Sequence, residues 1–240
     1  MISEIVSKTN QKIKYLCELK TSKGRNKHRQ FLCEGKKALE MALQANAVKE
    51  VYTLEVLKLP KHINQYIVTE EIMKKISSSV SPEGVVFVSD FIQEKTDFGS
   101  KLIYLDGVSD PGNMGTIIRT ALALGYDGVF YSKGSVSPYN EKVVASSKGA
   151  IFLIPVIETE LHLLKLKYQV IVSALSDNSV TLKEVKPNKN FVLVLGNESH
   201  GVSEETLQLA DVVCKIPIEN IDSLNVAVAG AILMYELREK

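Results

Sequence analysis

The sequence of 240 residues predicts an α/β protein, with a small N-terminal α/β domain and a larger C-terminal domain built on a parallel sheet. Strands and helices alternate over roughly the first 90 residues, which is typical of an α/β domain. The alternation restarts near residue 101 with strands that are almost unbroken runs of Val, Ile and Leu. Such runs are typical of parallel strands covered by helices on both faces. We therefore expect domains over 1–91 and 101–240, joined by a polar linker over 92–100.

The N-terminal domain is predicted to begin with a helix over 10–20, because its apolar residues share one face and Asn10 can cap it. The basic stretch TSKGRNKHR at 21–29 contains no apolar residue, so we expect a flexible loop there. The next elements are predicted in chain order as a strand over 31–35, a helix over 36–46, a strand over 48–54, a helix over 69–79 opened by Thr69, and a strand over 84–91.

The C-terminal domain is predicted to alternate in the same way. Its strands are expected over 101–106, 127–132, 150–156, 168–175, 190–196 and 211–218. Its helices are expected over 114–125, 140–148, 159–166, 203–209 and 223–240. Ligands of open parallel sheets bind at the carboxyl ends of the strands. Loops rich in glycine and polar residues follow three of these ends, at 106–113 (DGVSDPGN), 196–201 (GNESHG) and 218–222 (IENID), and we expect them to converge on one cleft.

The composition, 45% hydrophobic and 24% charged, is that of an ordinary soluble globular protein. No apolar run is long enough to span a membrane, and the polar N-terminus lacks the apolar core of a signal peptide. The three cysteines share no CxxC spacing, which indicates reduced thiols in a cytoplasmic protein. The four histidines have no cysteine partners at ligand spacing, so we expect no metal site.

The charge distribution is uneven. Residues 1–40 hold ten Lys or Arg against four Glu, a net charge of +6, whereas the whole chain carries +1 and the remainder therefore −5. A basic N-terminal region is typical of a surface that meets phosphates. A solvated helix face with lysines for solubility explains the charge equally well.

In the first loop, Asn113 is expected to cap the following helix, and Arg119 lies within that helix among apolar neighbours. An arginine in such a setting needs a carboxylate or phosphate partner, and a structural ion pair is the plainer explanation. In the second loop, Glu198 stands in a glycine-bracketed turn that allows close approach of a ligand, or that is simply a tight turn before a helix. In the third, Ser223 and Asn225 open a helix rich in small residues, and Ser223 is expected to cap it.

Three common signatures are missing from the sequence. No GxGxxG follows the first strand of either domain, and neither GxxxxGK[ST] nor GxSxG occurs. Their absence argues against an ordinary dinucleotide-binding turn, a phosphate-loop nucleotidase and the common hydrolases.

The three loops, in this order and spacing, resemble the SpoU/TrmH family of RNA ribose 2′-O-methyltransferases, part of the SPOUT superfamily. DPGNMGTIIRTALALG is similar to the family's first motif, LGNESHGVSEE to its second and IPIENIDSLNVAVAGAILMYE to its third. The N-terminal stretch NQKIKYLCELKTSKGRNKHRQFLCEGKKALEMAL resembles the family's small substrate-binding domain, so the match covers almost the whole chain.

The resemblance implies a deep trefoil knot, a homodimer and S-adenosylmethionine as cofactor. It implies the catalytic residues Asn113, Arg119, Glu198, Ser223 and Asn225. It also implies cofactor contacts by Ala174, Leu175, Leu195, Gly196, Asn197, Gly201, Ile216, Ile218, Ser223, Leu224, Asn225 and Ala229. Candidate RNA contacts are Arg25, Lys27, Arg29, Lys36 and Lys148, the last substituting for a basic residue that some members carry where this chain has Ala145.

The sequence therefore predicts a cytoplasmic enzyme that methylates a ribose 2′-hydroxyl in structured RNA. Large-subunit ribosomal RNA is favoured as substrate because the separate N-terminal domain resembles that of members acting on ribosomal RNA. Three alternatives stay open: a transfer RNA ribose methyltransferase, a base methyltransferase of the same superfamily, and a non-catalytic RNA-binding factor in ribosome assembly or antibiotic resistance.

Overall fold

The computed structural model describes residues 1–92, 98–176 and 179–238. The chain forms two compact units, Met1–Gln93 with Tyr139–Leu153, and Glu94–Pro138 with Ile154–Lys240. The segment Tyr139–Leu153 thus packs with the N-terminal unit, although it lies within the range expected for the C-terminal domain. Of the expected linker over 92–100, residues 93–97 lie outside the described residues.

The N-terminal unit contains a five-stranded mixed sheet in the order β1-β4-β3-β5-β2. Its strands are β1 (Ile2–Ile5), β2 (Gln30–Glu34), β3 (Val48–Thr53), β4 (Asn64–Val68) and β5 (Val85–Asp90). β4 pairs in parallel with β1 and β3, whereas β5 is antiparallel to β2 and β3. The sheet is therefore mixed.

Helices α1 (Gln11–Leu19) and α4 (Glu70–Ile76) bury their apolar faces against the sheet of this unit. Asn10 and Thr69 cap them as predicted, each accepting a hydrogen bond from a backbone N–H of its helix. The unit is completed by α2 (Ser22–His28), α3 (Lys36–Gln44), α6 (Glu141–Ser147) and the 3₁₀ helix η1 (Ala150–Phe152).

Two predictions for this unit and its neighbourhood are wrong, and two strands were missed. The expected loop over 21–29 is helix α2, whose Thr21 cap accepts a hydrogen bond from the Gly24 N–H. A Cβ on Gly24 would lie 2.0 Å from the Glu18 carbonyl oxygen, so the helix packs on its neighbour through backbone rather than through apolar side chains. Of the expected strand over 150–156, residues Ala150–Phe152 form η1, and only Val156 lies in a strand, which runs from Val156 to Glu158. Strands β1 and β4 were not predicted.

The C-terminal unit contains a seven-stranded sheet in the order β10-β12-β9-β11-β6-β7-β8. The strands are β6 (Lys101–Asp106), β7 (Gly128–Tyr131), β8 (Val156–Glu158), β9 (Gln169–Ser173), β10 (Val180–Thr181), β11 (Phe191–Gly196) and β12 (Val212–Lys215). Every pairing is parallel, which confirms the predicted parallel sheet. The two-residue strand β10 was not predicted.

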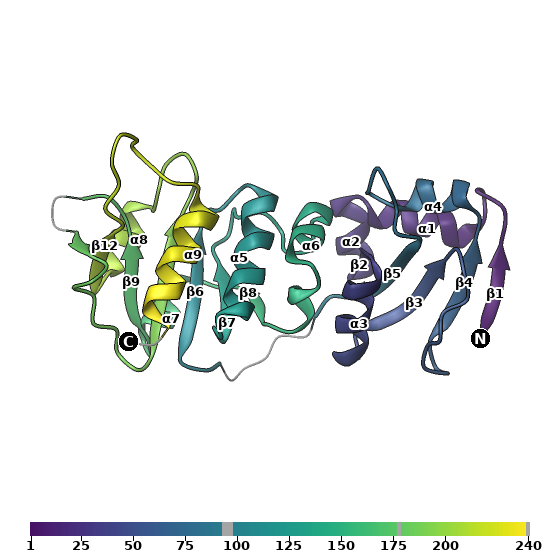
Figure 1. The fold of residues 1–240 in the computed structure, drawn as a ribbon, viewed down its shortest axis with the longest axis horizontal. Coiled ribbons are helices and arrows are strands. Elements are labelled where there is room, and N and C mark those ends of the chain that lie inside the picture. Colours follow the sequence, from purple (N-terminus) through teal and green to yellow (C-terminus); the bar gives the residue numbers. More distant parts are fainter. Residues whose placement is uncertain (93–97, 177–178, 239–240) are drawn as a thin grey trace. The chain divides into compact units, whose positions relative to one another are not determined.

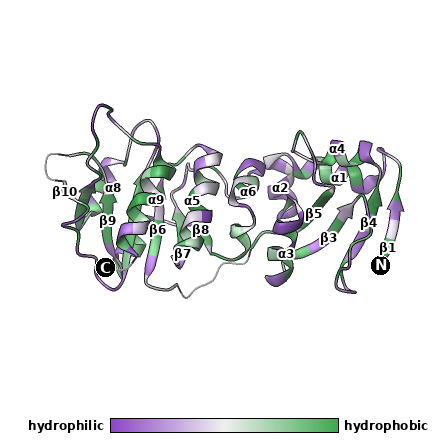
Figure 2. Ribbon diagram, viewed as in Figure 1, coloured by the Kyte–Doolittle hydropathy of each residue, from purple (hydrophilic) through white to green (hydrophobic). Residues whose placement is uncertain are grey.

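Helices cover both faces of this sheet: α5 (Pro111–Ala123) and α9 (Val226–Leu237) on one, α7 (Leu161–Lys165) and α8 (Glu204–Leu209) on the other. Val194 of β11 packs in a cluster with Leu161 and Leu164 of α7, whereas the next residue, Leu195, faces Gly230 of α9. Helices α5 and α9 lie side by side (Figure 1). Helix α9 is hydrophobic along most of its length (Figure 2).

Within the described ranges, no helix is long and apolar enough to cross a membrane. In the same part of the chain, no group of three or more His, Cys, Asp and Glu side chains is placed to hold a metal ion. The three cysteines are free thiols.

Candidate active site

A cavity of about 620 Å³ opens at the carboxyl ends of β9, β11 and β12 in the C-terminal unit. Its volume is within the range of small-molecule sites, roughly 300–1,000 Å³. All twelve positions expected to contact a cofactor line it: Ala174, Leu175, Leu195, Gly196, Asn197, Gly201, Ile216, Ile218, Ser223, Leu224, Asn225 and Ala229. The second and third loops therefore converge on one cavity, as predicted, whereas no residue of the first loop, 106–113, lines it.

Several lining residues are not among the positions that the resemblance supplied. They are Ser173, Ser199, His200, Val202, Leu207, Lys215 and Val226. Ser173 and Lys215 are the last residues of β9 and β12. Because ligands of parallel sheets bind at the carboxyl ends of the strands, a search of every strand end would have found these two residues.

The second loop is a tight turn closed by two backbone hydrogen bonds. The N–H of Asn197 donates to the Gly201 carbonyl at 2.7 Å, and the N–H of Gly201 donates to the Asn197 carbonyl at 3.0 Å. A Cβ on Gly196 would lie 2.3 Å from the carbonyl carbon of Gly201, a distance that no side chain tolerates. Gly196 is thus required for the turn to fold back beside the cavity.

The end of β6 holds this turn on both sides. The Asn197 side-chain amide donates to the Gly107 carbonyl at 2.7 Å. The N–H and the hydroxyl of Ser203 both donate to the Asp106 carboxylate, at 2.8 and 3.0 Å. Ser203 also caps α8, its hydroxyl accepting a hydrogen bond from the Thr206 N–H. The first loop thereby fixes the position of the second.

A chain of side-chain hydrogen bonds joins the three loops. The amide of Asn225 donates to Oδ1 of Asn113 at 2.9 Å, and the amide of Asn113 donates to Oε1 of Glu198 at 2.9 Å. Glu198 also accepts from the backbone N–H groups of Ser109 and Asp110, at 3.2 and 3.1 Å, and from the Ser109 hydroxyl at 3.1 Å. One carboxylate therefore clamps the first loop against the second.

These hydrogen bonds change the acidity of Glu198. Partial burial raises the pKa of its carboxyl, but hydrogen bonds from the Asn113 amide and from backbone N–H groups outweigh burial and hold the pKa below its ordinary value. Glu198 is consequently ionised at neutral pH and acts here as a hydrogen-bond acceptor.

Two predicted helix caps are wrong. Asp110 caps α5 by accepting from the Asn113 N–H, which leaves the Asn113 side chain available to bridge Asn225 and Glu198. Asn225, not Ser223, caps α9, and its Oδ1 accepts from the N–H groups of Ala227 and Val228. Asn225 thus caps a helix with its oxygen and positions Asn113 with its nitrogen.

Arg119 is exposed on α5 and is not among the residues that line the cavity. It forms neither an ion pair nor a hydrogen bond with the part of the chain that the structure describes, so the structural ion pair considered for it is not found. Six residues along an α-helix separate Arg119 from Asn113 by about 9 Å and about 240° of rotation. The two side chains therefore leave the helix in different directions, and the Arg119 guanidinium is exposed to solvent.

Residues 100–235 match the SpoU rRNA Methylase family, and residues 10–86 match the MRM3-like substrate binding domain. The first match alone spans more than half of the chain. The chain belongs to the SpoU rRNA methylase family. It is a methyltransferase of RNA, as the resemblance of its three motifs predicted.

Among similar proteins, the 23S rRNA (guanosine(2553)-2′-O)-methyltransferase RlmP of Bacillus subtilis is 33% identical over 247 residues, covering 99% of this chain and all of that relative. An AdoMet-bound rRNA methyltransferase from Sinorhizobium meliloti has a TM-score of 0.88 at 29% identity, over 99% of this chain and 97% of that one. A second structure, an RNA 2′-O ribose methyltransferase, has a TM-score of 0.82 at 26% identity, over 97% of both chains.

The expected RNA contacts of this SpoU family member lie in its N-terminal unit. Lys27, Arg29, Lys36 and Lys148 are exposed. Arg25 is only 6% exposed, and its guanidinium donates to the carbonyls of Leu19 and Lys20, at 3.4 and 2.9 Å. Arg25 thus stabilises the junction of α1 and α2, and we leave it out of the proposed RNA surface.

Proposed function

We propose that this protein transfers a methyl group from S-adenosylmethionine to a ribose 2′-hydroxyl of large-subunit ribosomal RNA. The observation that carries the proposal is the hydrogen-bond chain Asn225–Asn113–Glu198, which joins all three family motifs beside a cavity of about 620 Å³. Family membership supports the reaction class. The Bacillus subtilis relative, which acts on a guanosine of 23S rRNA, supports a guanosine as target.

The cavity fits S-adenosylmethionine in chemistry as well as in size. Leu195, Ile216 and Leu224 offer apolar contacts, and the bare backbone at Gly196 lets a ligand approach closely. When bound, the cofactor supplies a methyl group already activated on its sulfonium. The protein's own contribution is then to position the ribose and to stabilise developing charge. The AdoMet-bound relative supports this assignment.

Arg119 is assigned the contact with the 2′-hydroxyl and a neighbouring phosphate. A guanidinium stays protonated at physiological pH, so it orients the hydroxyl and stabilises oxyanion charge rather than removing the proton. Asn113, held between Glu198 and Asn225, has its amide fixed in one orientation for the ribose. Ser223, which is exposed on the cavity wall, is assigned to the same group of polar contacts.

A homodimer is part of the proposal. The outer face of α9 carries Val228, Ile232 and Tyr235 at helical spacing, exposed by 52%, 38% and 55%. Contiguous exposed apolar side chains mark interaction surfaces, and a two-fold dimer is the commonest assembly. Arg119 lies on α5, the neighbour of α9, so a dimer built on this face brings the free guanidinium to the boundary between protomers.

We also propose the trefoil knot of the family. The chain leaves β12, returns past β9 and places α9 against β11, two strands away in the sheet. This crossing from the end of β12 back to β11 supports the proposal, and residues of the crossing segment 216–225 form one wall of the cavity.

Mapping 2′-O-methyl groups in the RNA of a strain that lacks this gene tests the function directly. We expect one ribose site in large-subunit ribosomal RNA to lose its methyl group, and the purified protein to restore it with S-adenosylmethionine. Loss of a transfer RNA site, or of a base methyl group, contradicts the substrate assignment. Calorimetry that detects no S-adenosylmethionine binding supports the non-catalytic RNA-binding factor instead. Ribosomal RNA as substrate also implies the cytoplasm as the compartment.

Substituting Gly196 by alanine is expected to weaken S-adenosylmethionine binding by at least about 100-fold, because overpacking against backbone forces the turn out of place. Calorimetry measures the loss. Glu205→Ala, an exposed change on helix α8 outside the cavity, is the control and should bind within about twofold of the wild type. A Gly196→Ala protein that binds like the wild type contradicts the assignment of this cavity to the cofactor.

Replacing Lys27 or Arg29 by alanine is expected to weaken RNA binding several-fold without changing which RNA is methylated. Removing one cation from a phosphate should lower the slope of log affinity against log salt concentration by about 0.7–0.9. Filter binding over a salt series measures that slope. Lys58→Ala is the control, because this lysine lies in the same unit but outside the proposed RNA surface. Affinity that does not vary with ionic strength contradicts the assignment.

A further inference from the structure

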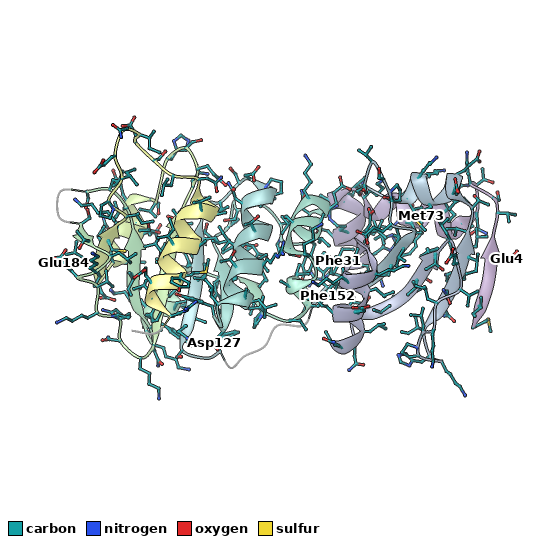
Figure 3. All side chains as sticks on the ribbon, viewed as in Figure 1. Glu4, Phe31, Met73, Asp127, Phe152 and Glu184 are labelled. Atoms are coloured by element: carbon teal, nitrogen blue, oxygen red, sulfur yellow. The ribbon has the colours of Figure 1, made fainter. Side chains whose placement is uncertain are left out.

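A second cavity, of about 340 Å³, lies entirely among residues of the N-terminal unit and is separate from the cofactor cavity. It is enclosed by the end of β2, the first turn of α3, the segment 78–83 and the stretch from α6 to η1. Leu32, Val144 and Phe152 line it with apolar atoms, and all three are buried. Phe152 is held in place by stacking on Phe31, with ring centroids 5.9 Å apart (Figure 3). One side of the cavity is therefore apolar.

Charged side chains surround this apolar side. Lys37, Lys142 and Lys148 line the cavity and form no ion pair with the described residues. Glu83 also lines it and accepts no hydrogen bond from the part of the chain that is described. Three ammonium groups and one carboxylate thus line the same cavity without protein partners among the described residues, so they can bind a ligand.

The other two carboxylates of the cavity are already engaged. Glu34 accepts from the Ser77 hydroxyl at 2.6 Å and from the Ser78 N–H. Glu141 accepts from the Ser78 hydroxyl at 2.7 Å. These contacts fasten the segment 78–83 to β2 and α6, so the cavity is built from elements that are tied to one another.

The backbone around the lysines is held in an uncommon conformation. Lys148 is the C-cap of α6 and ends that helix in the left-handed region, with φ of 51°. At the next residue, Gly149, a Cβ would lie 2.6 Å from the Met41 sulfur and 3.2 Å from the Ala38 Cα. This close approach of the start of η1 to α3 places Lys148 and Lys37 on the same cavity.

We propose that this cavity binds one unpaired guanosine nucleotide of the RNA substrate, an inference that rests on the proposed function. The base lies against Phe152, and the Glu83 carboxylate accepts hydrogen bonds from the two neighbouring N–H donors on the Watson–Crick edge of guanine. Lys37, Lys142 and Lys148 neutralise the phosphates on either side. Adenine offers only one donor on that edge, so the carboxylate favours guanine. The N-terminal unit thereby anchors a nucleotide other than the methylated one.

Saturation-transfer difference NMR with guanosine 5′-monophosphate tests the proposal on the full chain, with S-adenosylmethionine present to occupy the other cavity. We expect saturable binding that is about tenfold tighter than that of adenosine 5′-monophosphate. Glu83→Gln should abolish that preference, whereas Glu40→Gln, an exposed change on α3 outside the cavity, should retain it. No saturable binding, or a preference that survives Glu83→Gln, overturns the proposal.

Steady-state kinetics of Glu83→Gln tests the nucleotide site independently of the methyl-transfer function. Glu83→Gln is expected to raise the KM for RNA about tenfold and to leave kcat and the affinity for S-adenosylmethionine unchanged. A change in kcat with an unchanged KM overturns the nucleotide site and leaves the methyl-transfer assignment intact. A wild-type protein that transfers no methyl group contradicts the proposed function, while the nucleotide titration can still be measured.

Discussion

Replacing Arg119 by alanine is expected to lower kcat for methyl transfer by about 100- to 1,000-fold, the usual cost of removing a donor to developing oxyanion charge. The affinity for S-adenosylmethionine should stay within about twofold, because Arg119 does not line the cavity. Stability should also be little affected, since the exposed side chain forms no ion pair with any described residue. Single-turnover methylation and calorimetry together measure these quantities.

Arg119→Lys is the sharper variant. Lysine keeps the charge but loses the planar fork that contacts a hydroxyl and a phosphate together, so we expect nearly the same loss as with alanine. Thr116→Ala, an exposed change one turn earlier on α5, is the matched control and should retain wild-type turnover. If Arg119→Lys keeps near-wild-type turnover, charge alone is sufficient and the proposed role of Arg119 is wrong.

The parallel sheet was predictable from the sequence because buried parallel strands need apolar residues on both faces. Short, unbroken apolar runs such as FVLVLG are typical of such strands. Strands β1 and β4 escaped prediction because they are short, partly polar and paired with each other across about 60 residues of chain. These two strands form because they pair with other strands, and a local sequence pattern does not indicate which distant segment a strand will pair with. The same limit explains why an all-polar stretch was not predicted as α2.

The positions of the site were predictable, whereas the hydrogen bonds within it were not. The resemblance of the motifs was enough to name twelve of the residues that line the cavity, although seven others were missed, and contact with a cofactor stays a prediction. Asn113 was expected to be a helix cap, but Asp110 stands three residues earlier and takes that role. Arg25 was expected at phosphates because it is basic, yet two carbonyls at the end of α1 bind it. Which of several neighbouring groups forms a given hydrogen bond depends on their positions in the folded chain. The sequence alone does not give those positions.

Replacing Glu198 by glutamine is expected to lower kcat/KM by about 100-fold, close to the loss expected for Glu198→Ala. Both oxygens of the carboxylate accept hydrogen bonds, from Asn113 and Asp110 on one and from Ser109 on the other. Glutamine puts an NH₂ group against one of these sets of donors, which leaves those donors unpaired at a cost of about 1–3 kcal/mol. Glu204→Gln, at the exposed start of α8, is the control and should retain activity.

The pH dependence of activity shows whether Glu198 only holds the loops together by accepting hydrogen bonds or also transfers a proton. The pKa of Glu198 is held below its ordinary value, so the clamp is fully formed above about pH 5 and is lost only as the pH falls through that lowered pKa. The deficit of Glu198→Gln relative to the wild type should therefore be constant between about pH 6 and pH 8. A deficit that grows or shrinks with pH in that range indicates that Glu198 exchanges a proton during turnover. Such a result would assign Glu198 to acid–base catalysis instead of a purely structural role, because a carboxylate that only accepts hydrogen bonds does not titrate between about pH 6 and pH 8.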